Sequence, residues 1–224
     1  MGFWGSIWSG IKSVAKVAVD IVKSTVKEVG KVLVEKATDF LKIGVEALQT
    51  VLNVVETIAK SLGIIKQEDN NEDLGDRAMR AEKNIEDFDS TRDYINYLRE
   101  EIKAKTKDEF ERLSPEERLA RRALGASILS KAIEEEFDTK IPIEFWEKAI
   151  KLGLDSKEIE EILEKFKSVG IKPEEFIKYL KRELNIQDED KIENSLIDAY
   201  KNLEPNATQE ELEEKILSMQ RKAF

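Results

Sequence analysis

Residues 11–65 read IKSVAKVAVDI, VKSTVKEVGKV, LVEKATDFLKI, GVEALQTVLNV and VETIAKSLGII, five successive stretches of eleven residues whose columns agree in chemistry. Apolar residues recur in the first, eighth and eleventh columns, and lysine or another polar residue occupies the sixth. Eleven residues make three helical turns at about 3.67 residues per turn, so the apolar face stays in line over a long distance. The pattern predicts either one long amphipathic helix or a helical hairpin that breaks near Gly30 or near Thr38–Asp39.

The rest of the chain predicts helices and no strand. Capping boxes, in which Thr, Ser or Asp is followed three residues later by Glu, begin at Thr106, Ser114, Asp155 and Thr208. Gly153 and Gly170 stand where helices should end. Helices are expected near 76–88, 90–104, 107–113, 115–137, 142–152, 156–168, 173–184, 189–203 and 208–221. The expected fold class is therefore all-α, with an acidic helical-hairpin bundle after the N-terminal region.

Charge divides the chain into two unlike parts. Residues 1–66 hold nine lysines and six acidic residues, a net charge of +3, whereas residues 67–224 hold 28 basic and 41 acidic residues, a net charge of -13. The acidic, turn-rich stretch QEDNNEDLGD begins at Gln67 and reads as a linker. The expected organisation is an amphipathic region over 1–66, an acidic linker over 67–75 and an acidic helical domain over 76–224.

Two groups of side chains in the acidic domain have a structural and a functional interpretation. Core or a groove for a partner is expected for Phe145, Trp146, Phe166, Phe176 and Tyr179. Intramolecular ion pairs are the expectation for the small basic patch of Arg118, Arg121 and Arg122. In both groups we expect the structural role.

Composition argues against an enzyme. The chain has no histidine and no cysteine, which excludes a Ser-His-Asp triad, a Cys-His pair and a conventional zinc site. Helical carboxylate metal sites normally use Glu-x-x-His, which this chain cannot supply. We therefore expect no catalytic residue, no metal, no cofactor and no small-molecule substrate. The net negative charge disfavours nucleic acid as a partner.

The first residues, MGFWGSIWSGIK, place Phe3, Trp4 and Trp8 close together with Lys12 as the only charged side chain. No positive region precedes an uninterrupted apolar core, so a secretory signal peptide is not expected. Charges recur every few residues through the repeats, which disfavours a single transmembrane span. A helix lying flat suits the pattern better, because tryptophan prefers the headgroup level and lysine stems reach upward to water.

A membrane surface is the predicted cover for the apolar face. An unbroken helix over the repeats would be too long for the protein's own second half to enclose. The side chains expected to contact lipid are Phe3, Trp4, Ile7, Trp8, Ile11, Val14, Ala18, Val22, Val29, Leu33, Phe40, Leu41, Leu48, Val51, Leu52, Val55 and Leu62.

The repeats, and above all STVKEVGKVLVEKATD over 24–39, resemble the eleven-residue lipid-binding repeats of the synucleins and of the exchangeable apolipoproteins. The similarity covers residues 11–65. This chain departs from the synuclein pattern because no exact KTKEGV unit recurs and a charged helical domain follows. The resemblance implies reversible binding of a lipid surface by an inducible helix.

The predicted function is therefore non-enzymatic binding of a membrane surface, by a peripheral protein or by a soluble one that associates reversibly. One alternative is a soluble structural or assembly subunit of a shell, virion or scaffold, in which residues 1–66 pack on neighbouring chains and give self-association. A second alternative is a pore-forming effector whose repeats oligomerise.

Overall fold

A computed structural model describes the backbone of residues 3–43 and 45–222 and the side chains of residues 13–43 and 47–222. Every regular element in these ranges is a helix, which confirms the all-α class. The chain divides into two compact units, Met1–Ile133 and Glu134–Phe224. The division falls inside a helix and differs from the boundary expected at 67–75.

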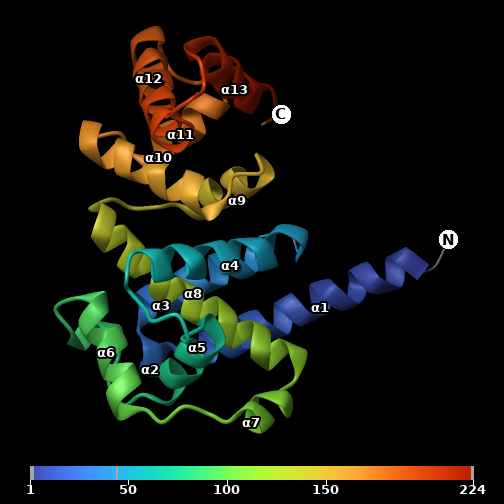
Figure 1. Ribbon diagram of the computed structural model, residues 1–224. Helices are drawn as coiled ribbons and strands as arrows, with labels where there is room; N and C mark the ends of the chain where they lie inside the picture. The colour runs from blue at the N-terminus through green and yellow to red at the C-terminus, as the bar shows by residue number, and fades with distance from the viewer. Residues whose placement is uncertain (1–2, 44, 223–224) are drawn as a thin grey trace. The chain divides into compact units, whose positions relative to one another are not determined.

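Within its described residues, the first unit contains nine helical elements, most of which are labelled in Figure 1. They are α1 (Phe3–Ser24), α2 (Val26–Val29), α3 (Lys31–Lys42), α4 (Val45–Ser61), α5 (Asn71–Arg80), the short 3-10 helix η1 (Ile85–Asp87), α6 (Thr91–Glu101), α7 (Lys107–Glu111) and most of α8 (Pro115–Phe137). The helix expected near 76–88 is thus replaced by α5, which begins and ends earlier, and by η1. The expected bounds of α8 are confirmed.

The repeat region does not form one long helix. Helix α1 ends at Ser24, and α2 ends where Gly30 adopts φ +88°, a conformation that glycine reaches without the steric cost of a side chain. The predicted break near Gly30 is therefore real. Thr38 and Asp39, by contrast, lie inside α3, which continues to Lys42. These breaks let α1 and α2 pack against α3, while α2 also contacts α5.

Helices α5 and α8 cross with their backbones in direct contact. A Cβ atom built on Gly75 would lie 1.9 Å from the carbonyl oxygen of Arg121, and one built on Gly125 would lie 1.9 Å from the carbonyl oxygen of Asn71. Only glycine fits at either position, because real Cβ contacts are never that short. The crossing fixes α5 on the long helix α8.

The same crossing docks the segment expected to be a linker. Asn70 caps the start of α5 by accepting from the Asp73 backbone N–H. The buried Asn71 donates its side-chain amide to the carbonyl of Leu52 at 2.8 Å, and its backbone N–H to Glu56 at 2.9 Å. Residues 71–75 therefore belong to α5 and are buried or half-buried, whereas residues 67–70 of the expected linker lie before the helix and are mostly exposed.

The second unit contains the end of α8 and five further helices. They are α9 (Ile143–Lys151), α10 (Ser156–Val169), α11 (Pro173–Leu180), α12 (Ile186–Leu203) and α13 (Gln209–Lys222).

All four predicted capping boxes of the chain form, with reciprocal bonds between each cap and its glutamate. Gly170 ends α10 in the left-handed conformation, and Gly153 follows α9 with φ +81°.

The aromatic side chains of the second unit form its core. Phe145, Trp146, Phe166, Phe176 and Tyr179 are all buried, as expected for the structural role. The rings of Phe145 and Phe176 lie 5.8 Å apart in an edge-on arrangement, and Phe166 lies 5.9 Å from Phe176. Helices α10 and α12 pack closely against each other, and α13 packs on α12.

The α5–α8 contact predicts that adding even a methyl group at Gly75 strongly destabilises the protein. Gly75→Ala should lower the free energy of unfolding by about 3 kcal/mol, because the added methyl meets backbone atoms that cannot rotate away. Gly63→Ala is the matched control, since Gly63 has φ +63° and open space around it; that change should cost about 1 kcal/mol. Urea unfolding monitored by circular dichroism measures both. Equal losses in the two variants would contradict the crossing.

Candidate functional site

The structure covers most of the apolar stripe that was predicted to face lipid. These predicted contact residues are buried: Ala18, Val22, Val29, Leu33, Phe40, Leu41, Leu48, Val51, Leu52 and Val55. In this conformation the chain itself encloses them, because the breaks after Ser24 and Lys42 fold the repeat region into several short helices. Lipid contact by these ten side chains stays a prediction, and it would require the first unit to open because they are buried in the folded protein. Val14 and Leu62 are half-buried.

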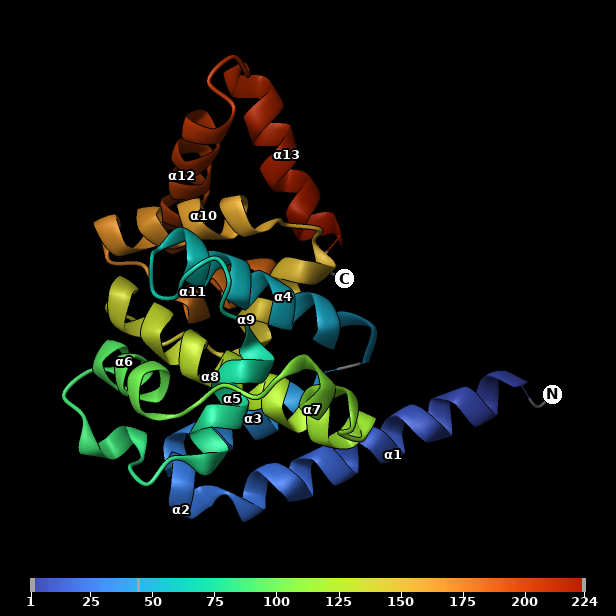
Figure 2. The same cartoon turned by 60° about the horizontal axis from the view of Figure 1, so that its bottom comes forward.

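The remaining predicted contacts belong to the start of α1. Phe3, Trp4, Ile7, Trp8 and Ile11 have side chains that lie outside the described residues. The helix backbone that carries them is described from Phe3 onward. In both views α1 runs out beyond the other helices of the first unit, with its N-terminal end farthest away (Figures 1 and 2).

Helical spacing relates this end of α1 to its covered end. At about 100° per residue, the positions of Phe3, Ile7 and Ile11 fall on the same side of the helix as those of Ala18 and Val22. Ala18 and Val22 are fully buried, and α1 packs on α3. One continuous apolar stripe is therefore covered in its second half and extends along a helix that projects past that cover.

Helices α1, α2 and α3 also expose a mixed set of side chains. Its large apolar members are Val17, Val26 and Val32, each more than 40% exposed. Its charged members are the exposed Lys16, Asp20, Lys23, Lys27, Lys31 and Glu35. The charge excess is small, so electrostatic attraction would contribute less than apolar burial.

No helix within the described residues is both long enough and apolar enough to cross a bilayer.

The most strongly charged part of the interior lies around Asp76, on the α5–α8 crossing. Asp76 is fully buried and pairs with Arg80 at 2.7 Å, with Arg121 at 2.9 Å and with Lys105. Burial alone would raise the pKa of Asp76, but hydrogen bonds from Lys105, Arg121 and Arg80 outweigh it and hold the pKa below its ordinary value. The carboxylate stays ionised. It links α5 to α8 through Arg121, and to the segment before α7 through Lys105.

The basic patch of α8 has the structural role expected from the sequence. Arg118 forms a two-pronged ion pair with Glu72, at 2.6 and 2.9 Å, and Arg121 pairs with Asp76. These ion pairs confirm the expectation. Arg122 differs, because it donates to the amide oxygens of Gln49 and Asn53 on α4. All three arginines connect helices of the first unit.

Across the described side chains, no group of three or more carboxylates is placed to hold a metal ion. Comparison of the chain with protein-family models, with curated proteins and with solved structures gives no match.

Sequence reasoning missed Gly75, Gly125 and Asp76. The available signal was a glycine inside each of two helical stretches, DLGD and ALGAS, because glycine in a helix interior costs about 1 kcal/mol relative to alanine and needs a reason. Nothing in the sequence indicates that these two glycines meet.

The Asp76 cluster predicts acid sensitivity of the first unit. The folded pKa lies below the unfolded value of about 3.9, so the contribution of Asp76 is complete above that value and is lost as pH falls through the folded pKa. Asp76→Asn should lower the free energy of unfolding at pH 7 by about 3 to 5 kcal/mol, because three cations lose their carboxylate. The variant should also show a weaker loss of stability below about pH 4.

Urea unfolding at pH 7 and at pH 3 measures these effects. Glu111→Gln is the control, because Glu111 is exposed and its pair with Lys107 spans 3.7 Å; that variant should stay within about 0.5 kcal/mol of the parent. An Asp76→Asn protein as stable as the parent at pH 7 would show that the cluster is not stabilising.

Proposed function

We propose that this protein binds lipid surfaces without enzymatic activity, through the N-terminal part of α1. The observation that carries the proposal is the projection of α1 beyond the helices of its own unit (Figures 1 and 2). The sequence of this part, FWGSIWSGI, supplies two tryptophans and no charge. Such a segment matches the headgroup level of a membrane, where tryptophan places an apolar ring beside a polar N–H.

Removing the apolar side chains of this segment from water is energetically favourable. Transfer of one large apolar side chain out of water contributes about 1.5 to 3 kcal/mol when its burial is complete. Phe3, Trp4, Ile7, Trp8 and Ile11 together therefore represent several kcal/mol that an acyl boundary would supply. Partial insertion, with lysine stems reaching back to the headgroups, still leaves a favourable balance.

The proposal leaves the rest of the repeat region folded. Exposing Leu33, Phe40 and Val51 to lipid would require the first unit to open, since these side chains are fully buried. Binding through the start of α1 needs no such opening. The implied mode is a folded body held at the surface by one projecting helix, which is more limited than the inducible helix that the resemblance to synuclein repeats implies.

In the assembly-subunit alternative, a neighbouring protein chain covers this segment in place of lipid. The two covers differ in what they require: lipid binding requires vesicles and is independent of protein concentration, whereas assembly proceeds in buffer and increases with concentration. Sedimentation velocity over a hundredfold concentration range, without lipid, separates them.

Replacing both N-terminal tryptophans tests the proposal. Trp4→Ser with Trp8→Ser should lower partitioning onto phosphatidylcholine vesicles by about 100-fold or more, at about 1.4 kcal/mol per factor of ten. Flotation of the full-length protein measures the partitioning. The matched control is Val169→Ser with Ile186→Ser, which removes two exposed apolar side chains from the second unit and should leave partitioning unchanged.

Tryptophan fluorescence supplies a second readout. Trp146 is buried, and its indole N–H has no hydrogen-bond partner, so Trp146→Phe removes its emission while keeping an aromatic ring in the core. The emission of Trp4 and Trp8 in this variant should shift to the blue when vesicles are added. Absence of flotation and of any shift, for a protein that unfolds cooperatively, would refute the proposal.

A further inference from the structure

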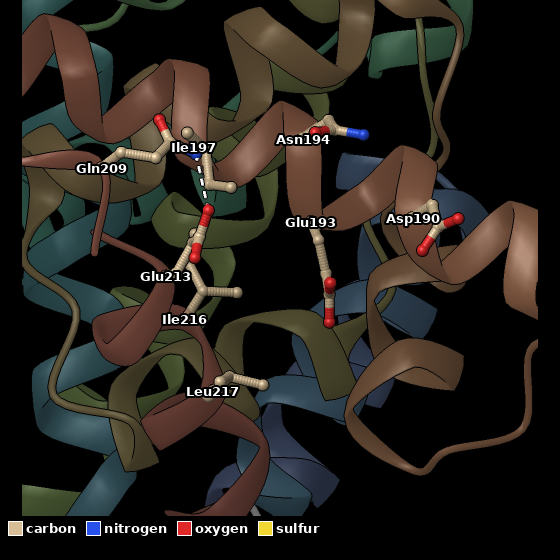
Figure 3. Close-up of a pocket in the computed structure, with 8 residues that line it drawn as sticks. All are labelled: Asp190, Glu193, Asn194, Ile197, Gln209, Glu213, Ile216 and Leu217. Carbon is tan, nitrogen blue, oxygen red and sulfur yellow. Dashed lines mark hydrogen bonds between the residues drawn. The ribbon is translucent and has the colours of Figure 1, made fainter. Parts of the chain in front are cut away.

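Helices α12 and α13 of the second unit line a half-open cavity of about 240 Å³, and most of its lining side chains are exposed (Figure 3). Each helix contributes one face, with residues spaced three, four or seven apart. The lining residues are Asp190, Glu193, Asn194 and Ile197 from α12 and Gln209, Glu213, Ile216 and Leu217 from α13. The cavity is thus a slot between two helix faces and belongs entirely to one unit.

The slot combines an apolar wall with carboxylates. Ile197 and Ile216 are buried, whereas Leu217 leaves 46% of its surface exposed. A leucine that exposed beside two buried isoleucines gives the slot an uncovered apolar strip. In Figure 3 the carboxylates of Glu193 and Glu213 lie on opposite sides of the slot, on different helices.

These carboxylates keep their charge uncompensated. Among the described residues, no lysine or arginine pairs with Asp190, Glu193 or Glu213 within 4.0 Å. Glu158 of the same unit, by comparison, lies 3.4 Å from the ammonium of Lys215. The three acids of the slot are therefore free to accept a cation.

Neutral donors hold two of the three carboxylates in place. The hydroxyl of the fully buried Tyr179 donates to Glu193 at 3.1 Å, and the side-chain amide of Gln209 donates to Glu213 at 2.9 Å. Burial and the neighbouring Glu193 raise the pKa of Tyr179, so its hydroxyl stays neutral. Both donors orient a carboxylate without cancelling its charge.

The lining selects the chemistry of a ligand. Anions are repelled, and the second unit as a whole has 24 acidic and 15 basic residues. A bare metal ion would leave the apolar strip uncovered, and within the described side chains no carboxylate group is arranged for one. An ammonium group on a methylene chain satisfies both parts of the slot, because the charge pairs with a carboxylate and the methylenes cover Ile216 and Leu217.

We propose that the slot between α12 and α13 binds a linear aliphatic polyamine. Two ammonium groups of one molecule pair with Glu193 and Glu213 across the slot, and the chain between them lies on the isoleucines and Leu217. The volume supports a slender ligand, because cavities for drug-sized molecules start at about 300 Å³. This inference is independent of lipid binding by α1, and it adds a small-molecule ligand where composition alone predicted none.

Titration of the full-length protein with spermidine tests the proposal. Calorimetry should show saturable binding of one molecule per chain, and methyl NMR should show the largest shifts at Ile197, Ile216 and Leu217. Glu193→Gln with Glu213→Gln should weaken binding by at least about tenfold, through loss of two charge-assisted hydrogen bonds. Leu217→Ser should weaken it by about fivefold, through loss of the apolar strip.

The control removes the same charge elsewhere. Glu164→Gln with Glu174→Gln changes two exposed carboxylates of the second unit and should leave the affinity within about twofold, because surface charges outside the slot are screened by salt. Equal weakening in both double variants would show that spermidine is only a diffuse counterion. Absence of saturable binding by spermidine would also overturn the proposal, and binding of a lysine-rich peptide in its place would assign the slot to a protein partner.

Discussion

Direct contact between the backbones of α5 and α8 is the constraint on which the first unit depends. Because Gly75 and Gly125 have no side chains, the two helices approach until each glycine meets a carbonyl of the other helix. This approach brings Asp76 within reach of Arg121 and buries Asn71, which reaches α4. Helix α4, the end of the repeat region, is thus tied to a crossing that the repeats themselves do not contain.

This tie explains why the apolar stripe has an intramolecular cover. An eleven-residue period determines which face of a helix is apolar, but it does not determine what covers that face. In this chain α1 and α3 pack together, and Val22, Leu33 and Val51 are fully buried. Lipid-binding repeats and core helices share the same pattern, so the pattern alone does not distinguish a lipid surface from the protein's own interior as the cover.

Features that depend on neighbouring residues were predicted correctly more often than features that depend on contacts between helices. The capping boxes at Thr106 and Asp155 form as predicted, and α8 has the predicted bounds, because each depends on residues three or four apart. The helix break at Gly30 was also predicted from the sequence. The start of α5 was missed, since acidic and turn-forming residues suggested a linker, while burial of Asn71 depends on α4 and α8. The slot between α12 and α13 was missed for the same reason: its helices were predicted, but the absence of a cation near Glu193 and Glu213 is a property of their packing.

The two glycines of the crossing bear on how relatives of this chain can be recognised. An aliphatic column accepts valine, isoleucine or leucine, so descendants can exchange these residues until no resemblance in sequence is left. Gly75 and Gly125 allow no exchange while the crossing persists, because every other amino acid carries the atom that collides. A pair of glycines in two helices, one of them followed by an aspartate and the other preceded four residues earlier by an arginine, is therefore a more durable mark of ancestry than the repeats.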